Sequence, residues 1–239
     1  MNYQVEAPPV RPRTALVFDV ETTGLLPQKP RYSTAPIPIT AYPHIIQLSF
    51  VLYDIANSTI LRSYDSYVKI DDNVVISEFV STLTGITPEI CNRKGNDIVS
   101  VLRAFNEAYA ECDVLVAHNI DFDEKMVMIE TERNRRRLIE TAPECLNIFN
   151  KIHEELRGIE RYCTMRKGIP VCNIMVESKI PGKPPNAKWP KLSELYATLF
   201  NNETVSGMHN SMVDVLACLR CYMKMRHNSD PGPLIPIKI

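Results

Sequence analysis

The sequence predicts an α/β fold in which a central, mixed, five-stranded sheet is flanked by helices. Residues 15–70 contain three strand patterns in succession, separated by turn-forming residues. After residue 70, strand patterns alternate with helical ones. Strands joined by turns run antiparallel, whereas a strand that follows a helix runs parallel to the strand it joins. We therefore expect three antiparallel strands at the start of the sheet and parallel strands added afterwards.

The individual elements follow from apolar and β-branched runs for strands and from apolar residues at turn spacing for helices. The expected strands are Ala15–Glu21, His44–Asp54, Ile60–Ile70, Asp113–His118 and Arg161–Thr164. The expected helices are Ser77–Leu83, Val99–Cys112, a long helix from Asp123 that includes Arg133, Leu192–Phe200 and a last helix from Ser211. At the start of that last helix, Ser211 as N-cap and Asp214 three residues later resemble a capping box.

The bulk composition suits a single globular domain and excludes some classes of protein. With 239 residues and 45% hydrophobic content, the chain can bury a large core. We expect a lead-in over residues 1–13, one domain over 14–226 and a tail over 227–239. The net charge of −1 excludes a generally basic nucleic-acid coat, so any attraction for phosphate must be local or run through bound metal.

Signal patterns, apolar runs and cysteine spacing predict the localisation of the protein and the redox state of its cysteines. It shows neither a secretion signal pattern nor an apolar run of membrane-spanning length, which predicts a soluble, intracellular protein, cytoplasmic or nuclear. Its seven cysteines are an odd number without close spacing, which favours reduced thiols. Cys218 and Cys221 have a zinc-like spacing, but they fall in a helical pattern and lack the further ligands that structural zinc needs.

Two proline-rich segments interrupt these elements. Pro27–Pro43 is long for a connection between strands, and it is either a rim of the substrate cleft or a surface excursion without a role. Pro170–Pro190 is a basic loop that holds the sole tryptophan, Trp189. That side chain could stack on a single strand or pack against the core. The run Arg133–Arg137 is likewise either a solvated helix face or a phosphate contact.

The first strand carries the most informative residues. Asp19 and Glu21 close an apolar strand, and side chains two residues apart on a strand point to the same side. A divalent cation is an effective way to hold two like charges at one spot. Asp123 follows a later strand, and Asp214 opens the last helix with His209 five residues before it. Parallel strands bring the acid-bearing ends of the first and fourth strands together.

With these motifs in place, the sequence resembles the DEDDh family of 3'→5' exonucleases. This group includes polymerase proofreading subunits, TREX-type DNases, RNase T and oligoribonuclease, and it has a ribonuclease H-like fold. The motifs match at Phe18–Gly24, His118–Asp123 and His209–Asp214, with lesser matches at Gly85–Thr87 and Lys191–Leu195. The resemblance spans Thr14 to Met225.

The resemblance implies roles for the matching residues. Asp19 would bridge two Mg²⁺ or Mn²⁺ ions, Glu21 and Asp214 would complete the first ion site, and Asp123 would hold the second. His209 would be the general base, for which an imidazole with its ordinary pKa of about 6.5 is suited. Substrate contacts would come from the amides of Thr22, Thr23 and Gly24, from Leu25 against the last base, and from Asn119.

Two details of the match are ambiguous. Asp121 lies two residues before Asp123 and could share its face, but the family pattern places the ligand directly after the aromatic residue, which selects Asp123. Ser211 stands where the family usually has alanine, and both residues are small. We expect activity to tolerate that difference.

The expected function is a metal-dependent hydrolase that removes nucleotides from the 3' end of DNA, preferably single-stranded or frayed, and releases nucleoside 5'-monophosphates. Such an activity serves DNA proofreading or repair. The alternatives are an exoribonuclease of the same family and a catalytically silent nucleic-acid-binding adaptor. A polymerase, an integrase or another protein could be its partner, and the chain could be a monomer or a homodimer.

Overall fold

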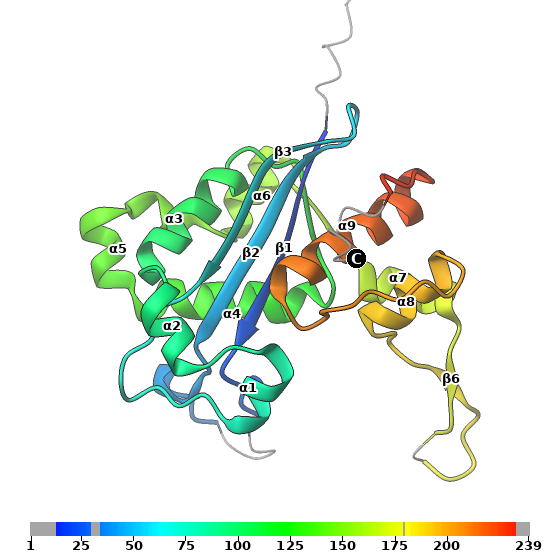
Figure 1. Ribbon diagram of the computed structural model, residues 1–239, viewed down its shortest axis with the longest axis horizontal. Coiled ribbons are helices and arrows are strands. Elements are labelled where there is room, and N and C mark those ends of the chain that lie inside the picture. The colour runs from blue at the N-terminus through cyan, green and yellow to red at the C-terminus, as the bar shows by residue number, and fades with distance from the viewer. Residues whose placement is uncertain (1–12, 30–33, 179, 233–239) are drawn as a thin grey trace, which may run out of the picture.

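The computed structural model describes residues 13–29, 34–178 and 180–232. Its centre is a five-stranded sheet in the order β3-β2-β1-β4-β5 (Figure 1). The strands are β1 Thr14–Thr22, β2 Ile45–Asp54, β3 Thr59–Tyr67, β4 Val114–Ala117 and β5 Glu160–Cys163. The first three strands pair antiparallel, β4 is parallel to β1, and β5 is parallel to β4. The predicted fold class is confirmed.

Helices cover both faces of the sheet, and β1 alternates between two cores. Leu16 and Phe18 belong to the core under α3 (Ile98–Tyr109) and α4 (Ile120–Arg133). Ala15 and Val17 belong to the core under α8 (Leu192–Leu199) and α9 (Ser211–His227). Because both faces are buried, β1 begins with a continuous apolar run from Ala15 to Phe18. Asp19 and Glu21 continue the alternation of Val17 and so face α9.

Three helices were not predicted: α2 Pro88–Lys94, α6 Lys151–Arg157 and α7 Thr164–Cys172, whereas α5 Arg135–Thr141 continues the predicted long helix. Helices α2 and α6 have seven residues each, too few for a clear apolar period. In α6 the pattern is also misleading, since Ile152 and Leu156 are exposed. The predicted long helix from Asp123 in fact starts at Ile120 and is divided at Asn134.

The Gly85–Thr87 segment connects two short helices. Gly85 adopts the left-handed conformation, with φ of 73°, that ends α1 (Glu78–Thr84). The side chain of Thr87 accepts a hydrogen bond from the amide of Ile90 and caps α2. This lesser motif therefore has a local structural reason.

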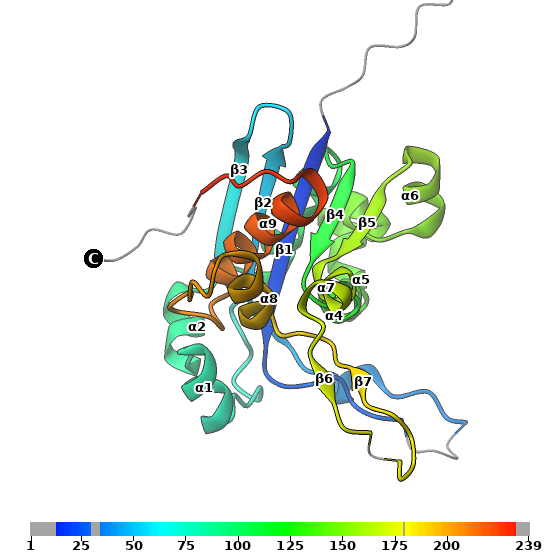
Figure 2. The same ribbon diagram turned by 90° about the vertical axis from the view of Figure 1, so that its right-hand side faces the viewer.

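The sequence predicts a loop over Pro170–Pro190, but only part of this segment is a loop. Its first residues end α7, and the next form a two-stranded antiparallel arm, with β6 at Met175–Val176 and β7 at Asn186–Ala187. The arm extends away from the main sheet, and both views show it clear of the helical layers (Figures 1 and 2). It returns to the body at Trp189, next to the start of α8.

The remaining predictions concern the chain ends, the cysteines and the arginine run. Residues 228–232 lie near α9, since Asp230 forms an ion pair with Arg220 at 2.7 Å; residues 1–12 and 233–239, and with them most of the lead-in and tail, lie outside the described residues. All seven cysteines are free. No helix in the described part of the chain is long and apolar enough to cross a membrane. Arg135, Arg136 and Arg137 are exposed and ion-paired to Glu132, Glu140 and Asp97, as expected of a solvated face. Arg133 is instead largely buried and pairs with the buried Glu130.

Candidate active site

Four carboxylates from three elements line one cavity of about 690 Å³. Asp19 and Glu21 project from the end of β1, just before an irregularity in the β1–β2 register between Glu21 and Thr22. Asp123 lies in the first turn of α4, and Asp214 lies in the first turn of α9. His209, in the segment before α9, lines the same cavity. All the residues predicted as catalytic are thereby brought together.

Asp123 is fixed by the main chain of β1. It is 3% exposed, and its Oδ1 accepts a hydrogen bond of 3.1 Å from the amide of Val20. Asp121 is exposed and forms an ion pair with Arg166 instead. The two acids begin a helix rather than end a strand, so they point about 200° apart around its axis. They do not share a face, so the ambiguity between them is resolved in favour of Asp123 in the cavity and Asp121 in solvent.

Asp214 and His209 are linked directly. The amide of His209 donates to Asp214 Oδ2 at 3.2 Å, and His209 has the left-handed backbone conformation, with φ of 69°. Such a conformation is uncommon outside glycine and is found at functional sites. One ligand atom each of Glu21, His209 and Asp214 lies within 4.8 Å of the others. Asp214 Oδ1 is buried and has no hydrogen-bond partner among the described residues.

The start of α9 differs from the predicted capping box. Asn210, not Ser211, is the N-cap, and its side chain accepts from the amide of Val213. Ser211 is fully buried and donates its hydroxyl hydrogen to the main-chain oxygen of Asp19 at 2.6 Å. Its amide donates to Gln47 Oε1 at 3.3 Å. The serine at this position therefore ties α9 to β1 next to the carboxylates, a role that an alanine could not perform.

Burial raises the pKa values of all four acids, and repulsion by a neighbouring acid adds to the shift at Asp19, Glu21 and Asp123. Burial is the main cause at Glu21, where the charges of Asp19 and Asp214 add to it and the pKa rises to about 9. At Asp19 the pKa is raised by burial and then by the charge of Asp214. The pKa of Asp123 is raised by burial and by Asp19, and that of Asp214 by burial. No arginine or lysine among the described residues offsets these shifts.

This donor set fits divalent cations. Four clustered carboxylates, one buried and three half-buried, are unfavourable without a paired cationic side chain unless a positive charge joins them. The unpartnered Asp214 Oδ1 supplies a ready ligand atom. Carboxylate oxygens are the ligands that magnesium and manganese prefer. Asp19, Glu21, Asp123 and Asp214 are the residues that would hold such ions.

The predicted substrate-contacting residues divide into two groups. Leu25, 86% exposed, and Asn119, which has a left-handed backbone, both line the cavity. Thr22, Thr23 and Gly24 form the turn beside it. The amide of Thr23 donates to the oxygen of His44 at 2.9 Å and its hydroxyl accepts from the His44 amide at 3.0 Å. That amide therefore has no hydrogen left for a nucleotide, whereas contacts by Thr22 and Gly24 stay predictions.

His118 has a role in the cavity wall that the motif alone did not reveal. Its Nε2 lies 3.0 Å from the carbonyl oxygen of Pro190, and its Nδ1 lies 3.0 Å from Thr164 Oγ1. A carbonyl only accepts, so Nε2 carries a hydrogen. Burial lowers the pKa of His118 to about 4, which keeps the ring neutral, with Nδ1 accepting from Thr164. His118 thereby fixes the segment that follows Trp189, and only the polarity of a histidine at a strand end could have signalled this.

Comparison with known proteins places this site in a family. Residues 16–222 match the model of RNase_T, described as an exonuclease family. The chain belongs to the RNase_T exonuclease family. The resemblance to the DEDDh 3'→5' exonucleases is thereby confirmed.

Curated relatives include DNA polymerase III PolC-type proteins. The protein from Bacillus subtilis strain 168 is 30% identical over 134 residues, which cover 54% of this chain and 8% of that protein. The protein from Listeria monocytogenes strain EGD-e is 36% identical over 111 residues, covering 46% and 6% respectively. The chain thus spans less than a tenth of the length of these relatives.

Solved structures of E. coli exonuclease I share the fold. The complex with a dT13 oligonucleotide covers 90% of this chain and 42% of its own, with a TM-score of 0.58 and 16% identity. A second structure of exonuclease I has a TM-score of 0.61 and 18% identity, with 90% and 42% covered. A ribonuclease H-like fold is thereby supported independently of the sequence motifs.

Proposed function

We propose that this protein is a metal-dependent 3'→5' exonuclease that acts on single-stranded or frayed DNA and releases nucleoside 5'-monophosphates. The observation that carries the proposal is the cavity itself, where four carboxylates without a cationic partner meet an imidazole. Residues 14–226 would form the exonuclease domain. The family membership supports the reaction class, and the geometry supports the choice of residues.

The acids would hold two Mg²⁺ or Mn²⁺ ions. Asp19 interacts electrostatically with each of the other three acids, so it would be suited to lie between the ions, with Glu21 and Asp214 on one side and Asp123 on the other. Such ions neutralise charge at a scissile phosphate and lower the pKa of bound water. The hydrogen bond from Val20 to Asp123 and the one from His209 to Asp214 fix both carboxylates before any ligand enters.

His209 would accept the proton of the attacking water. Its amide anchors it to Asp214, while its ring is exposed to the cavity. The left-handed backbone directs the ring toward Glu21 and Asp214 rather than along the helix. Leu25 and Asn119 would contact the terminal nucleotide from the opposite wall.

DNA is the proposed substrate because of the relatives. The curated relatives are named DNA polymerases, and several of the matching exonuclease I structures contain a DNA oligonucleotide. One of those is a zinc-bound form of an exonuclease I complex with single-stranded DNA. For this chain the oxygen-rich donor set favours magnesium or manganese. A polymerase partner is the corresponding proposal for assembly.

The test uses 5'-labelled single-stranded DNA, single-stranded RNA and a duplex with a mismatched 3' end, each with magnesium, manganese or EDTA. Shortening from the 3' end that EDTA abolishes is expected for the DNA substrates. Faster shortening of RNA would instead favour the exoribonuclease. Binding without shortening under every condition would overturn the proposal in favour of an adaptor.

A matched pair of variants assigns the role of Asp123. Asp123→Asn should lower the rate about a thousandfold, since a metal ion supplies several kcal/mol of charge stabilisation. Asp121→Asn changes an acid in the same turn of α4 that faces Arg166, and it should leave the rate unchanged. Equal effects of both variants would contradict the assignment. His209→Ala should retain metal binding but lose most of its turnover.

A further inference from the structure

Trp189 is the sole tryptophan of the chain and one wall of the candidate active site. It is 62% exposed, so it does not pack against the core, which is the more frequent fate of a single tryptophan. It lines the same cavity as Asp19 and Asp214. Large aromatic side chains contribute much stability when buried, so an exposed indole at a cavity wall indicates a binding surface.

The main chain around Trp189 is held on both sides. The amide of Lys188 donates to the oxygen of Ile174 at 2.9 Å, at the base of the β6–β7 arm. The carbonyl of Pro190 accepts from His118, and the amide of Lys191 donates to Glu194 Oε2 at 2.8 Å. The segment therefore presents the indole from a fixed position while leaving it in solvent. Preorganisation of this kind lowers the entropy cost of binding a ligand.

The polar groups around the indole favour one kind of ligand over another. An apolar protein side chain could cover Trp189, but it would leave the neighbouring carboxylates and Asn119 without polar partners. An unpaired nucleobase has a flat face for the indole and a polar edge for such groups. Lys191, two residues further on and in the same cavity wall, adds a positive charge for a phosphate.

We propose that Trp189 stacks on a nucleobase of the bound strand and thereby selects unpaired, single-stranded nucleic acid. This inference rests on the proposed function, because it assigns the ligand of the same cavity. An indole can reach the face of a base only where that base has left its neighbour, so a duplex must fray before its end can bind. Leu25, on the other wall, and Trp189 are the two strongly exposed apolar side chains of the cavity.

Fluorescence tests the contact directly, since all tryptophan emission comes from residue 189. The Asp19→Asn variant, which blocks turnover, is titrated with a short oligothymidylate in magnesium. Binding is followed in parallel by the anisotropy of a 5'-dye on the oligonucleotide. We expect quenching of the tryptophan emission that saturates with the same Kd as the anisotropy.

Variants give the energetic weight of the contact. Trp189→Ala should weaken binding by about 5- to 150-fold, which corresponds to the effect of removing one base–aromatic stack. Trp189→Phe keeps an aromatic face and should recover most of that loss. Leu156→Ala removes another strongly exposed apolar side chain, on α6, and should have no effect. In the active protein, Trp189→Ala should raise KM and leave kcat nearly unchanged.

An abasic scan locates the stacked base. A series of oligonucleotides carries one abasic residue at successive positions from the 3' end. At one position the loss of the base should weaken binding to the Trp189 protein but not to the Trp189→Ala variant, because the stack is already absent. A loss of equal size in both proteins at every position would overturn the inference.

The outcomes separate this inference from the proposed function. Cleavage with unchanged tryptophan emission and unchanged binding by Trp189→Ala would overturn the stacking role while leaving the nuclease intact. Quenching without cleavage under any metal would support the stack and overturn the nuclease. Absence of any binding to the oligonucleotide would overturn both.

Discussion

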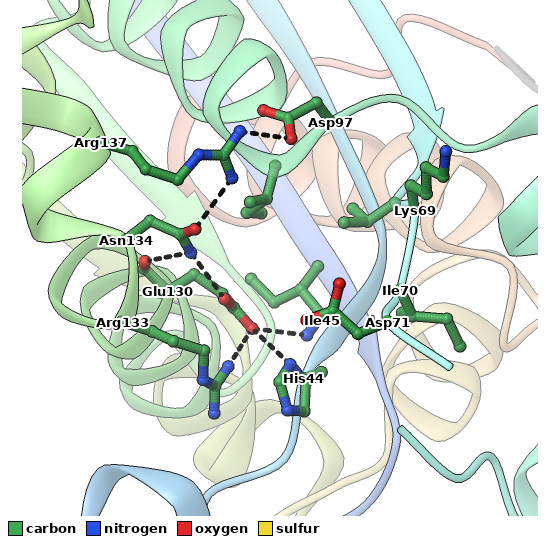
Figure 3. Close-up of a pocket in the computed structure, with 12 residues that line it drawn as sticks. His44, Ile45, Lys69, Ile70, Asp71, Asp97, Glu130, Arg133, Asn134 and Arg137 are labelled. Atoms are coloured by element: carbon green, nitrogen blue, oxygen red, sulfur yellow. Dashed lines mark hydrogen bonds and ion pairs between the residues drawn. The ribbon is translucent and has the colours of Figure 1, made fainter. Parts of the chain in front are cut away.

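Helix α4 carries two buried acids in contrasting surroundings, Asp123 in its first turn and Glu130 two turns later. Each is 3% exposed. Glu130 forms an ion pair with Arg133, accepts from the amide of Ile45 at 3.2 Å, and lies 3.7 Å from His44 Nδ1 (Figure 3). Asp123 accepts one hydrogen bond from Val20, and its charged neighbours are other acids.

The contrast shows how a structural buried charge differs from a functional one. Burial raises the pKa of Glu130, but the charge of Arg133 and its hydrogen bonds oppose the shift. At Asp123 a second acid adds to the shift instead. Arg133 is itself fully engaged, since it also donates to the oxygens of Tyr42 at 3.0 Å and Pro43 at 3.1 Å. In the cavity beside Glu130, of about 350 Å³, the acids Glu130 and Asp97 are paired with arginines of the chain, whereas the candidate catalytic cavity leaves its acids for an external cation.

Removing Arg133 should disrupt the buried ion pair with Glu130, and we expect this change to have the largest effect on stability. Arg133→Met leaves Glu130 buried without its partner, which costs about 3–5 kcal/mol of unfolding free energy. Urea denaturation followed by circular dichroism measures the loss. The double variant Glu130→Met, Arg133→Met should recover part of it, since the uncompensated charge is gone. A double variant less stable than Arg133→Met would show that the pairing of Glu130 is unimportant.

Added metal should stabilise the protein through the carboxylate cluster of the cavity and not through Glu130. Magnesium or manganese at a hundredfold excess over its Kd should raise the unfolding free energy by about 2.7 kcal/mol. Asp214→Asn should remove that increment, and Glu130→Gln should keep it even though it lowers the starting stability. Thermal unfolding with and without EDTA measures both. An increment that survives in Asp214→Asn would place the ions elsewhere.

The pH dependence of stability in the metal-free protein should distinguish the carboxylate cluster from Glu130. Since the pKa of Glu21 is raised to about 9, the folded state binds more protons than the unfolded state at neutral pH. Stability should therefore fall as the pH rises, by about 1–2 kcal/mol between pH 6.5 and pH 8. Raised pKa values of buried thiols add to the slope only at higher pH.

Chemical denaturation in EDTA across that range measures the slope. Glu21→Gln should reduce the slope, because one titrating carboxyl is gone while those of Asp19, Asp123 and Asp214, whose pKa values are also raised, remain. Saturating metal should flatten the slope in the unchanged protein. Glu130→Gln should retain the slope of the unchanged protein. A slope of the same size in Glu21→Gln would contradict the assignment of the titration to the carboxylate cluster.

The sheet could be predicted because its signals are local. Both sides of β1 are buried, so its apolar run is continuous, and the alternation that follows from the pleat already placed Asp19 and Glu21 on one side. The grouping of Asp123, Asp214 and His209 with them came from matching spaced motifs to a family. The sequence alone contains no distance between these side chains.

The remaining features depend on contacts between distant segments. Ser211 bonds to the oxygen of Asp19 and Arg133 to the carbonyls before β2, and neither partner is close in sequence. The exposure of Trp189 depends on the β6–β7 arm and on His118, which hold its main chain away from the core. The short helices α5 and α6 are formed by packing rather than by a period of their own.

The smallest expected effect on stability is that of changing Arg136, which can be compared with Arg133 in the same arginine run. Arg133 and Arg136 lie three residues apart, but their side chains are 17% and 95% exposed. Arg136 pairs with Glu140 at 3.6 Å in solvent, where such pairs contribute about 0–1 kcal/mol. The change in unfolding free energy caused by Arg136→Ala should therefore be several-fold smaller than that caused by Arg133→Met. Its Kd for single-stranded DNA should keep the same dependence on salt, whereas a shallower slope would mean that Arg136 contacts a phosphate after all.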